Sequence, residues 1–283
     1  MLQESTNILI IGLGMIGGSY AEGLKRAGYE IGAITRSQKT LDYALEKGII
    51  DSGSTEVTRD YVSRFDILVF ALYPHTFLDW IDRYQDCIRD GALLTDVTGV
   101  KGAVVYSVQQ RLRPGLEFIG AHPMAGRERS GVESADCSVF RGANYIVTPT
   151  PANSLEAIRT CEEIGRTLGF GRISTLSPEA HDEMIGFLSQ LTHCIAVALM
   201  NCKESEHLVR FTGDSFRDLT RIARINEEMW PELFALNKTE LLAQMDLFQK
   251  EFSRLRNAIA KDDLETEREM MRTSTLRRSY FDK

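Results

Sequence analysis

The stretch that decides the fold of the first half of the chain is NILIIGLGMIGGS, residues 7–19. Its first five residues are almost all apolar, with no polar alternation, which is typical of a strand buried on both faces of a parallel sheet. Glycines follow at positions 12, 14 and 17, and residues 15–27 have a helical pattern closed by Gly28. Between a strand and a helix, this G-x-G-x-x-G spacing predicts a dinucleotide-binding turn and disfavours a glycine-rich turn without a ligand.

The three glycines of such a turn have separate roles. Gly12 permits the tight exit from the strand, Gly14 lets the backbone approach a pyrophosphate, and Gly17 lets the helix pack closely against the strand. The N-terminus of that helix directs its backbone N–H groups at the anion. The expected cofactor-binding residues of the turn are Gly12, Leu13, Gly14, Met15, Ile16 and Gly17.

The residues after the second expected strand indicate which dinucleotide is bound. An NAD site usually has an Asp or Glu about twenty residues after the glycines, where it accepts hydrogen bonds from the ribose. This chain has Thr35, Arg36 and Ser37 instead. Because no acid repels a phosphate here and an arginine can bind one, these residues favour NADP over NAD. In the alternative interpretation Arg36 is only solvated, and NAD is bound through Thr35 and the backbone.

Strand and helix patterns alternate up to residue 176. This alternation predicts an α/β fold whose N-terminal domain, residues 1–176, is a Rossmann-type doubly wound parallel sheet. We expect strands at residues 7–11, 30–35, 66–71, 92–95 and 116–121, and helices at 15–27, 38–47, 77–88, 102–111 and 154–168. Residues 145–147 and 171–176 are candidates for edge strands.

The second half, residues 177–283, is predicted to be an all-helical domain. Residues 178–202 form a helical pattern that is apolar nearly all round, so we expect this helix to be buried in a core or against a partner. A later stripe has the four-three spacing of helix-on-helix packing: Leu241, Met245, Phe248, Phe252, Leu255 and Ile259. Because so few helices cannot cover these faces, a homodimer through the helical domain is favoured over a single intramolecular bundle.

Composition narrows the class of partners. A formal net charge of −7 over 283 residues, without a block of Lys or Arg, argues against nucleic acid and anionic membranes. The five cysteines have no C-x-x-C spacing, which favours reduced thiols in a cytoplasmic protein and no metal site. The N-terminal residues show no signal peptide, and we expect no membrane span. The partner is therefore expected to be a small molecule that a few placed cations hold.

A second constellation, GAHPMAG at residues 120–126, follows an expected sheet strand. Ligands of open α/β sheets bind beyond the carboxyl ends of the strands, so His122 is placed where a nicotinamide would project. A histidine there can accept a hydroxyl proton during hydride transfer near neutral pH. The rigid loop around it favours this catalytic role for His122 over a structural one.

Five motifs together resemble those of the prephenate dehydrogenase family, whose members use prephenate or its amino analogue arogenate. They are GLGMIGGS, AHPMAG, SQLTH at residues 189–193, FRDLTRIA at 216–223 and MW at 229–230. The resemblance extends over most of the chain. It implies oxidative decarboxylation of prephenate or arogenate on the route to tyrosine. In that family the residue matching His122 bonds the ring hydroxyl, and the residue matching Arg221 holds a substrate carboxylate.

The residue types fit this chemistry, because aromatisation drives the loss of carbon dioxide and neither a metal nor a covalent nucleophile is needed. The protein must supply a base, cationic side chains and orientation. Arg221 can bind a carboxylate bidentately, although an ion pair is the usual role of an arginine. Ser189 and His193 lie one turn apart on a polar stripe with Asp182, and we expect them to face the substrate. A buried core histidine is the alternative for His193.

The sequence also departs from the family pattern. Many relatives have a serine that orients the catalytic histidine where Gly99 stands, and we expect Thr98 to supply this hydroxyl. Gln190 replaces a frequent histidine. Arg127 replaces a small hydroxyl residue, and we expect it to bind a carboxylate or to influence the choice between prephenate and arogenate. No strand-rich sensing domain follows the helical domain, so inhibition by tyrosine would have to act at the active site.

Two other classes share parts of this pattern. Hydroxyacid dehydrogenases and imine reductases combine a Rossmann domain with a helical dimerisation domain, but they usually rely on a catalytic lysine or aspartate. A non-catalytic dinucleotide sensor would keep the glycines without needing His122 and Arg221 together. Of the other histidines, His75 and His207 are expected in loops, and the role of His181 stays open.

Overall fold

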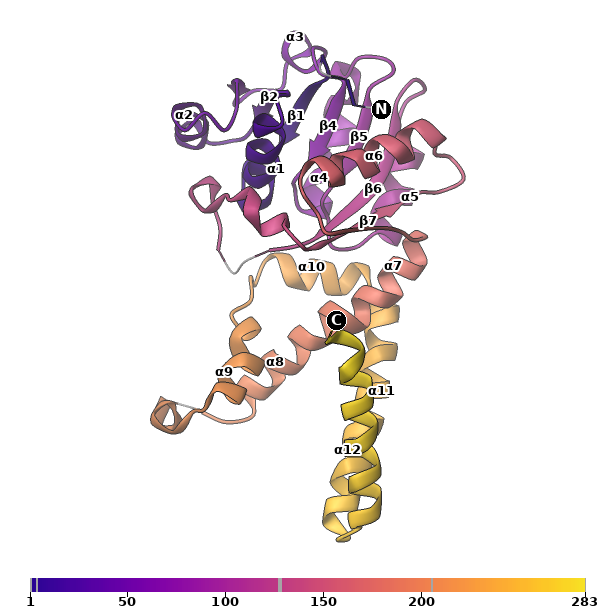
Figure 1. Cartoon of the computed structure of the whole chain (residues 1–283). Coiled ribbons are helices and arrows are strands. Elements are labelled where there is room, and N and C mark those ends of the chain that lie inside the picture. The colour runs from indigo at the N-terminus through magenta and orange to yellow at the C-terminus, as the bar shows by residue number, and fades with distance from the viewer. Residues whose placement is uncertain (1, 4, 127–128, 205, 283) are drawn as a thin grey trace.

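The computed structural model describes residues 2–3, 5–126, 129–204 and 206–282. The chain forms an α/β half and a helical half, which lie one above the other in Figure 1. The last strand of the α/β half ends at Thr175 and the first helix of the helical half begins at Pro178, so the expected boundary after Leu176 lies between the two.

The α/β half is built on one eight-stranded sheet with the strand order β3-β2-β1-β4-β5-β6-β7-β8. Its strands are β1 Asn7–Ile11, β2 Glu30–Ile34, β3 Ser52–Ser54, β4 Ile67–Phe70, β5 Leu93–Asp96, β6 Glu117–Met124, β7 Asn144–Thr148 and β8 Arg172–Thr175. The first six strands in this order, from β3 through β1 to β6, are parallel, which confirms the doubly wound sheet. Strand β7 runs antiparallel to β6, and β8 is parallel to β7.

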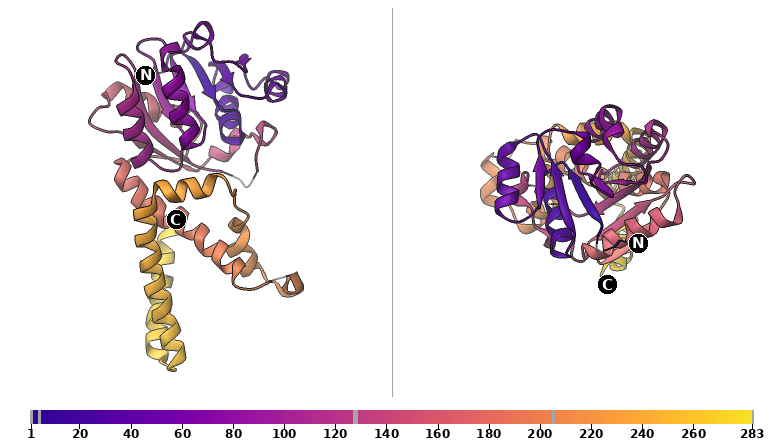
Figure 2. Two further views of the ribbon diagram at one scale, coloured as in Figure 1. Left: turned by 180° about the vertical axis from the view of Figure 1, so that it is seen from behind. Right: turned by 90° about the horizontal axis from the view of Figure 1, so that it is seen from above.

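Helices cover both faces of the sheet (Figure 2). They are α1 Met15–Arg26, α2 Gln38–Glu46, α3 Arg59–Val62, α4 Pro74–Tyr84, α5 Gly102–Arg111 and α6 Leu155–Thr167, with short 3₁₀ turns η1 Gln85–Cys87, η2 Val132–Ser134 and η3 Cys137–Phe140. Alternate residues of β1 enter two separate apolar clusters: Ile8 and Ile10 pack on one face, and Leu9 and Ile11 pack on the other. All four are at most 1% exposed, as expected for a strand buried on both faces.

The helical half begins with one continuous helical run. Helix α7 (Pro178–Ile185) passes into a π-helical segment η4 (Gly186–Leu191) and then into α8 (Thr192–Asn201). The remaining elements are η5 Glu206–Phe211, α9 Asp214–Thr220, η6 Arg221–Ala223, α10 Met229–Leu236, α11 Lys238–Ala260, α12 Leu264–Arg278 and η7 Ser279–Phe281. The single helix expected over residues 178–202 is therefore interrupted by a π turn, a feature that often occurs at functional sites.

Helices α11 and α12 form an antiparallel pair that projects away from the sheet (Figures 1 and 2). Of the expected apolar stripe, Leu241 is buried, but Met245, Phe248, Phe252 and Ile259 are 38%, 40%, 60% and 58% exposed within the single chain. This exposed stripe is the kind of surface that a second protein chain covers.

The first helical run of this half is also largely uncovered. Within the described residues, Pro178–Asn201 is long and apolar enough to cross a membrane by length and composition alone, with a mean hydropathy of 1.4 and only 28% of the window buried. A core helix of a soluble protein meets the same criterion. Phe187 and Leu188 are 56% and 46% exposed, so its own chain covers this helix only in part, and burial against a partner, the other expectation, stays a prediction.

Candidate active site

The glycine turn leaves no room for side chains at two of its positions. Gly12 has a φ of +97°, and a Cβ there would lie 2.4 Å from the carbonyl oxygen of Ala71. A Cβ on Gly17 would lie 1.9 Å from the carbonyl oxygen of Gly12. A Cβ on Gly14, in contrast, would meet nothing within 4 Å, and Gly14 caps α1 without a side-chain hydrogen bond. The turn therefore presents open space and uncapped backbone N–H groups, which fits a pyrophosphate.

Between these glycines, Leu13 and Met15 are buried and Ile16 is half-buried. Leu13 and Ile16 belong to the apolar cluster on one face of the sheet. Their side chains thus hold the turn against the sheet. Only their backbone groups are therefore expected to contact a dinucleotide.

The three residues after β2 have different surroundings. The backbone N–H of Thr35 donates to the carbonyl of Ser54 at 3.3 Å. Ser37 caps α2, because its hydroxyl accepts from the backbone N–H of Thr40 at 3.2 Å. Arg36 is exposed at the carboxyl end of β2. Arg36 therefore follows β2 at the edge of the sheet where ligands of open α/β sheets bind.

A buried ion pair fixes the turn between β5 and α5. The Lys101 ammonium donates to Asp96 Oδ2 at 2.6 Å, and both side chains are fully buried. Asp96 Oδ1 accepts from the backbone N–H of Ala121 at 3.0 Å, which ties β5 to β6 one residue before His122. Burial lowers the pKa of Lys101, and the Asp96 carboxylate opposes that shift. Sequence reasoning did not identify this pair, although two charged residues around the end of a buried strand are an unusual pattern.

His122 lies on β6 itself rather than in a loop after it. Its strand continues to Met124 because β7 pairs with it, and His122 lies opposite Ile146 in that pairing. The His122 Nδ1 atom is 2.9 Å from Nε2 of His181, whose own Nδ1 is 2.8 Å from Asp182 Oδ1. Burial, then the neighbouring His181 and Lys101, holds the pKa of His122 well below its usual value. His122 is therefore neutral at pH 7 and able to accept a proton.

The expected role of Thr98 needs correction. Its hydroxyl donates its one hydrogen to the Asp96 carboxylate or to the carbonyl of Val100, and it accepts from the Lys101 ammonium at 3.0 Å, so it belongs to the buried ion-pair cluster. The contact to His122 comes from His181 instead. A Cβ on Gly99, where relatives were expected to have serine, would lie 3.9 Å from His122 Nε2.

The expected substrate residues lie on the helical half. His193 Nδ1 donates to the carbonyl of Ser189 at 2.8 Å, and its ring packs on Trp230 with the ring centroids 3.9 Å apart. Ser189 and His193 are both half-buried. Arg221 is exposed and begins η6, which packs against α8, the helix that carries His193. Arg127 lies outside the described residues.

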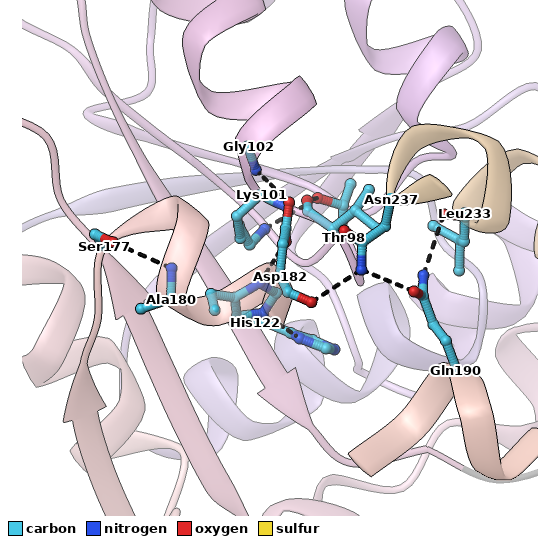
Figure 3. A network of polar contacts seen from close by, with 12 residues as sticks. Thr98, Lys101, Gly102, His122, Ser177, Ala180, Asp182, Gln190, Leu233 and Asn237 are labelled. Atoms are coloured by element: carbon cyan, nitrogen blue, oxygen red, sulfur yellow. Dashed lines mark hydrogen bonds and ion pairs between the residues drawn. The ribbon is translucent and has the colours of Figure 1, made fainter. Parts of the chain in front are cut away.

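A network of amides within the helical half lies at the candidate site (Figure 3). Gln190 Nε2 donates to the carbonyl of Leu233 at 3.1 Å, and Asn237 Nδ2 donates to Gln190 Oε1 at 2.8 Å and to the carbonyl of Asp182 at 2.9 Å. Leu233 in turn lies beside Gly99, because a Cβ added to Gly99 would be 3.6 Å from Leu233 Cδ1. Gln190 thus has a structural role here, because the network ties the end of α10 to α7 and to the π-helical segment. Leu233 packs in the apolar cluster that also contains Val100, in the turn between β5 and α5.

These features define a class of protein: a dehydrogenase with a Rossmann-type nucleotide-binding half, a neutral histidine at the carboxyl edge of the sheet, and a helical second half. Residues 20–170 match the family described as prephenate dehydrogenase, nucleotide-binding domain, and residues 177–273 match prephenate dehydrogenase, dimerization domain. The first of these ranges begins beyond Gly17, so the assignment of the glycine turn rests on its geometry.

Individual relatives agree with the family match. The chain is 30% identical over 272 residues to the prephenate dehydrogenase of Bacillus subtilis, covering 94% of this chain and 73% of that one. It is 29% identical over 269 residues to the cyclohexadienyl dehydrogenase of Zymomonas mobilis, covering 91% and 89%. A crystal structure of prephenate dehydrogenase from A. aeolicus, in complex with hydroxyphenyl propionate and NAD+, matches with a TM-score of 0.90, 29% identity and 99% coverage of both chains. The chain belongs to the prephenate dehydrogenase family.

Proposed function

We propose that this protein catalyses the oxidative decarboxylation of prephenate to 4-hydroxyphenylpyruvate in tyrosine biosynthesis, with arogenate as the alternative substrate. The observation that carries the proposal is the placement of His122. It lies at the carboxyl edge of the sheet, its pKa is lowered by burial, and its Nε2 faces the side-chain-free position of Gly99. A neutral imidazole in that position can take a proton from a hydroxyl group.

The reaction needs a base beside a ring hydroxyl. His122 Nε2 takes the hydroxyl proton while the carbon that bears this hydroxyl loses a hydride. The nicotinamide, when bound, supplies the hydride acceptor. The bond between the ring and its carboxylate then breaks, carbon dioxide leaves, and the electron pair completes the aromatic ring. The proton held by His122 returns to the product oxygen, so that the base is regenerated.

The helical half offers the groups for the two carboxylates and the side chain of the substrate. Arg221 supplies a guanidinium suited to bidentate carboxylate binding. His193 donates from Nδ1 to the carbonyl of Ser189 and packs its ring on Trp230, which makes its half-buried imidazole a candidate for contact with the substrate. Ser189 supplies a half-buried hydroxyl on the same face of the helical run. Arg127 remains a candidate for a further carboxylate contact.

Arg36 supports NADP as the favoured cofactor. The described part of β2 and its following turn has no carboxylate between Ile34 and Ser37, and Arg36 is exposed there. An arginine binds a phosphate through charge-assisted hydrogen bonds, whereas an NAD site gains from an acid at this position. The A. aeolicus relative was crystallised with NAD+, so a preference for NADP would distinguish this chain from that relative.

We further infer that the protein is a homodimer through its helical half. The exposed apolar stripe of α11 and the uncovered face of α7 and α8 lie in the range that matches the dimerization domain. A second copy would cover both surfaces with apolar residues of the same kind.

The deciding experiment measures reduced nicotinamide formed by the purified protein with prephenate or arogenate and with NAD+ or NADP+. We expect the fastest turnover with prephenate and NADP+. Turnover only with arogenate would mean that arogenate, and not prephenate, is the substrate. A preference for NAD+ would contradict the role of Arg36. No turnover in all four combinations, from a folded protein that still binds dinucleotide, would contradict the proposed reaction.

A further inference from the structure

The nitrogen of His122 that does not face the reaction is held by a chain of buried groups. His122 Nδ1 is 2.9 Å from His181 Nε2, and the two rings meet edge to face with centroids 5.1 Å apart. His181 is fully buried, and its Nδ1 is 2.8 Å from Asp182 Oδ1. His122 belongs to the sheet half and the other two residues to the helical half, so this chain of contacts crosses the boundary between the halves.

The carboxylate at the far end can only accept hydrogen bonds. Asp182 Oδ1 accepts from the backbone N–H of Lys101 at 2.8 Å, and Oδ2 accepts from that of Gly102 at 2.7 Å. These two N–H groups begin α5, so the positive end of the helix also favours a carboxylate there. Figure 3 shows Asp182 between this helix start and His122. The atom of His181 that faces Asp182 must therefore carry a hydrogen.

The position of that hydrogen on His181 determines which nitrogen of His122 carries a hydrogen. Burial lowers the pKa of His181, so its imidazole is neutral at pH 7 and has one hydrogen, on Nδ1. Its Nε2 is then an acceptor, and His122 must donate to it from Nδ1. The remaining nitrogen of His122, Nε2, carries a free lone pair. The opposite arrangement would place two lone pairs 2.8 Å apart between His181 and Asp182.

We propose that His181, backed by Asp182, is a positioning residue that holds His122 in the tautomer with hydrogen on Nδ1, so that Nε2 is the proton acceptor. This inference rests on the proposed function, in which His122 is the base. When Nε2 takes the substrate's hydroxyl proton, His122 becomes an imidazolium whose Nδ1–H still donates to His181. The buried Lys101–Asp96 pair exchanges no proton in this step.

The geometry also separates His181 from the serine that many relatives were expected to have. A side chain at Gly99 would approach Nε2 of His122, at 3.9 Å, whereas His181 contacts Nδ1. The two groups act on opposite nitrogens. His181 therefore sets which nitrogen is the base, and a residue at position 99 would act on the proton acceptor itself.

The test compares His181→Leu with His181→Gln. Leucine removes the acceptor for His122 Nδ1–H, whereas the glutamine amide oxygen can replace it. We expect the leucine variant to lose about 100-fold or more in kcat, as expected for a histidine base in the wrong tautomer, with little change in KM or in dinucleotide affinity. The glutamine variant should recover most of this loss. A leucine variant within threefold of the wild-type kcat, or a glutamine variant that is no better than leucine, would overturn the proposal.

A second measurement does not depend on turnover. The chain has five histidines, so ¹⁵N-histidine labelling gives few signals, and a His122→Asn variant identifies those of His122. At neutral pH we expect His122 to carry its hydrogen on Nδ1 in the wild type and to shift toward the Nε2–H form in His181→Leu. A wild-type His122 with its hydrogen on Nε2 contradicts the inference even if prephenate is turned over. The expected tautomer without turnover of either substrate contradicts the proposed function alone.

Discussion

The two halves of the molecule satisfy their apolar surface in different ways. In the sheet half, β1 buries Ile8, Leu9, Ile10 and Ile11 almost completely within one chain. In the helical half, Phe252 on α11 is 60% exposed although it belongs to a regular apolar stripe. The sheet half therefore has the core of an independent domain, and the helical half needs a partner surface. The same division holds in the proposed active site, where the base is on the sheet and the groups for substrate carboxylates are on helices.

The largest effect should come from removing the base on the sheet half. His122→Asn keeps a polar side chain of similar size but cannot accept the hydroxyl proton, so we expect kcat to fall by about 10³- to 10⁴-fold. The dinucleotide dissociation constant should stay within threefold of the wild type, because the glycine turn is untouched. Stopped-flow or steady-state assays with prephenate, together with calorimetric titration of the dinucleotide, measure both quantities.

His193→Asn on the helical half is the matched comparison. Its imidazole is expected to bind substrate rather than to move a proton, so KM should rise by about tenfold while kcat changes little. If His193→Asn removed turnover and His122→Asn did not, the base would be on the helical half and the division of roles between the halves would be wrong.

The second effect concerns the exposed stripe. Phe252→Asp should weaken the dimer by about 100-fold or more, because burial of a phenylalanine side chain contributes about 1.5 to 3 kcal/mol and a symmetric interface contains it twice. Sedimentation velocity over a range of protein concentrations measures the change. Leu155→Asp on α6 is the control, because Leu155 is 71% exposed and lies on the sheet half, outside the apolar stripe of α11. An unchanged dimer in Phe252→Asp would place the interface elsewhere.

The difference between the halves also explains what the sequence revealed. Strand β1, the glycine turn and α5, whose bounds Gly102–Arg111 were predicted to the residue, depend on local patterns of apolar residues and glycines. Strand β3 was not predicted, because Ser52–Ser54 is short and has no apolar residue. Strand β6 extends three residues beyond its predicted end because β7, a distant segment, pairs with it.

The candidate site was predicted only in part for the same reason. His122 was identified from its place after a strand and from the family resemblance. The contacts that control it were not, because the hydrogen bond from the Lys101 backbone to Asp182 joins residues 81 positions apart. No periodicity connects such residues. The adjacent pair His181-Asp182 just after Ser177-Pro178, at the start of a helix, was the available indication, but its partner could be known only from the fold.

A third and smaller effect would separate the two cofactors within the sheet half. Arg36→Ala should raise the KM for NADP+ by about 10- to 100-fold, because a charge-assisted hydrogen bond to a phosphate contributes about 1.5 to 3 kcal/mol. The KM for NAD+ should stay within threefold, since NAD+ lacks that phosphate. Initial-rate assays with both cofactors measure the ratio. Equal changes for both would mean that Arg36 does not contact the ribose phosphate.

The smallest effect tests whether the buried histidines at the boundary between the halves are neutral. The pKa values of His122 and His181 are lowered in the folded protein, mainly by burial, relative to about 6.5 in an unfolded chain. Above about pH 6.5 both states hold neutral histidines, so these residues add no pH dependence to the free energy of unfolding.

Below about pH 6.5 the unfolded chain binds protons that the folded protein does not. The free energy of unfolding should then fall by up to about 1.4 kcal/mol per pH unit for each histidine, until the pH reaches the folded-state pKa. Urea unfolding at several values between about pH 7.5 and 5 measures this slope, and His122→Asn should reduce it because one of the two groups is removed. A slope that His122→Asn leaves unchanged would mean that His122 binds protons equally in the folded and unfolded states, so that burial does not lower the pKa of this base.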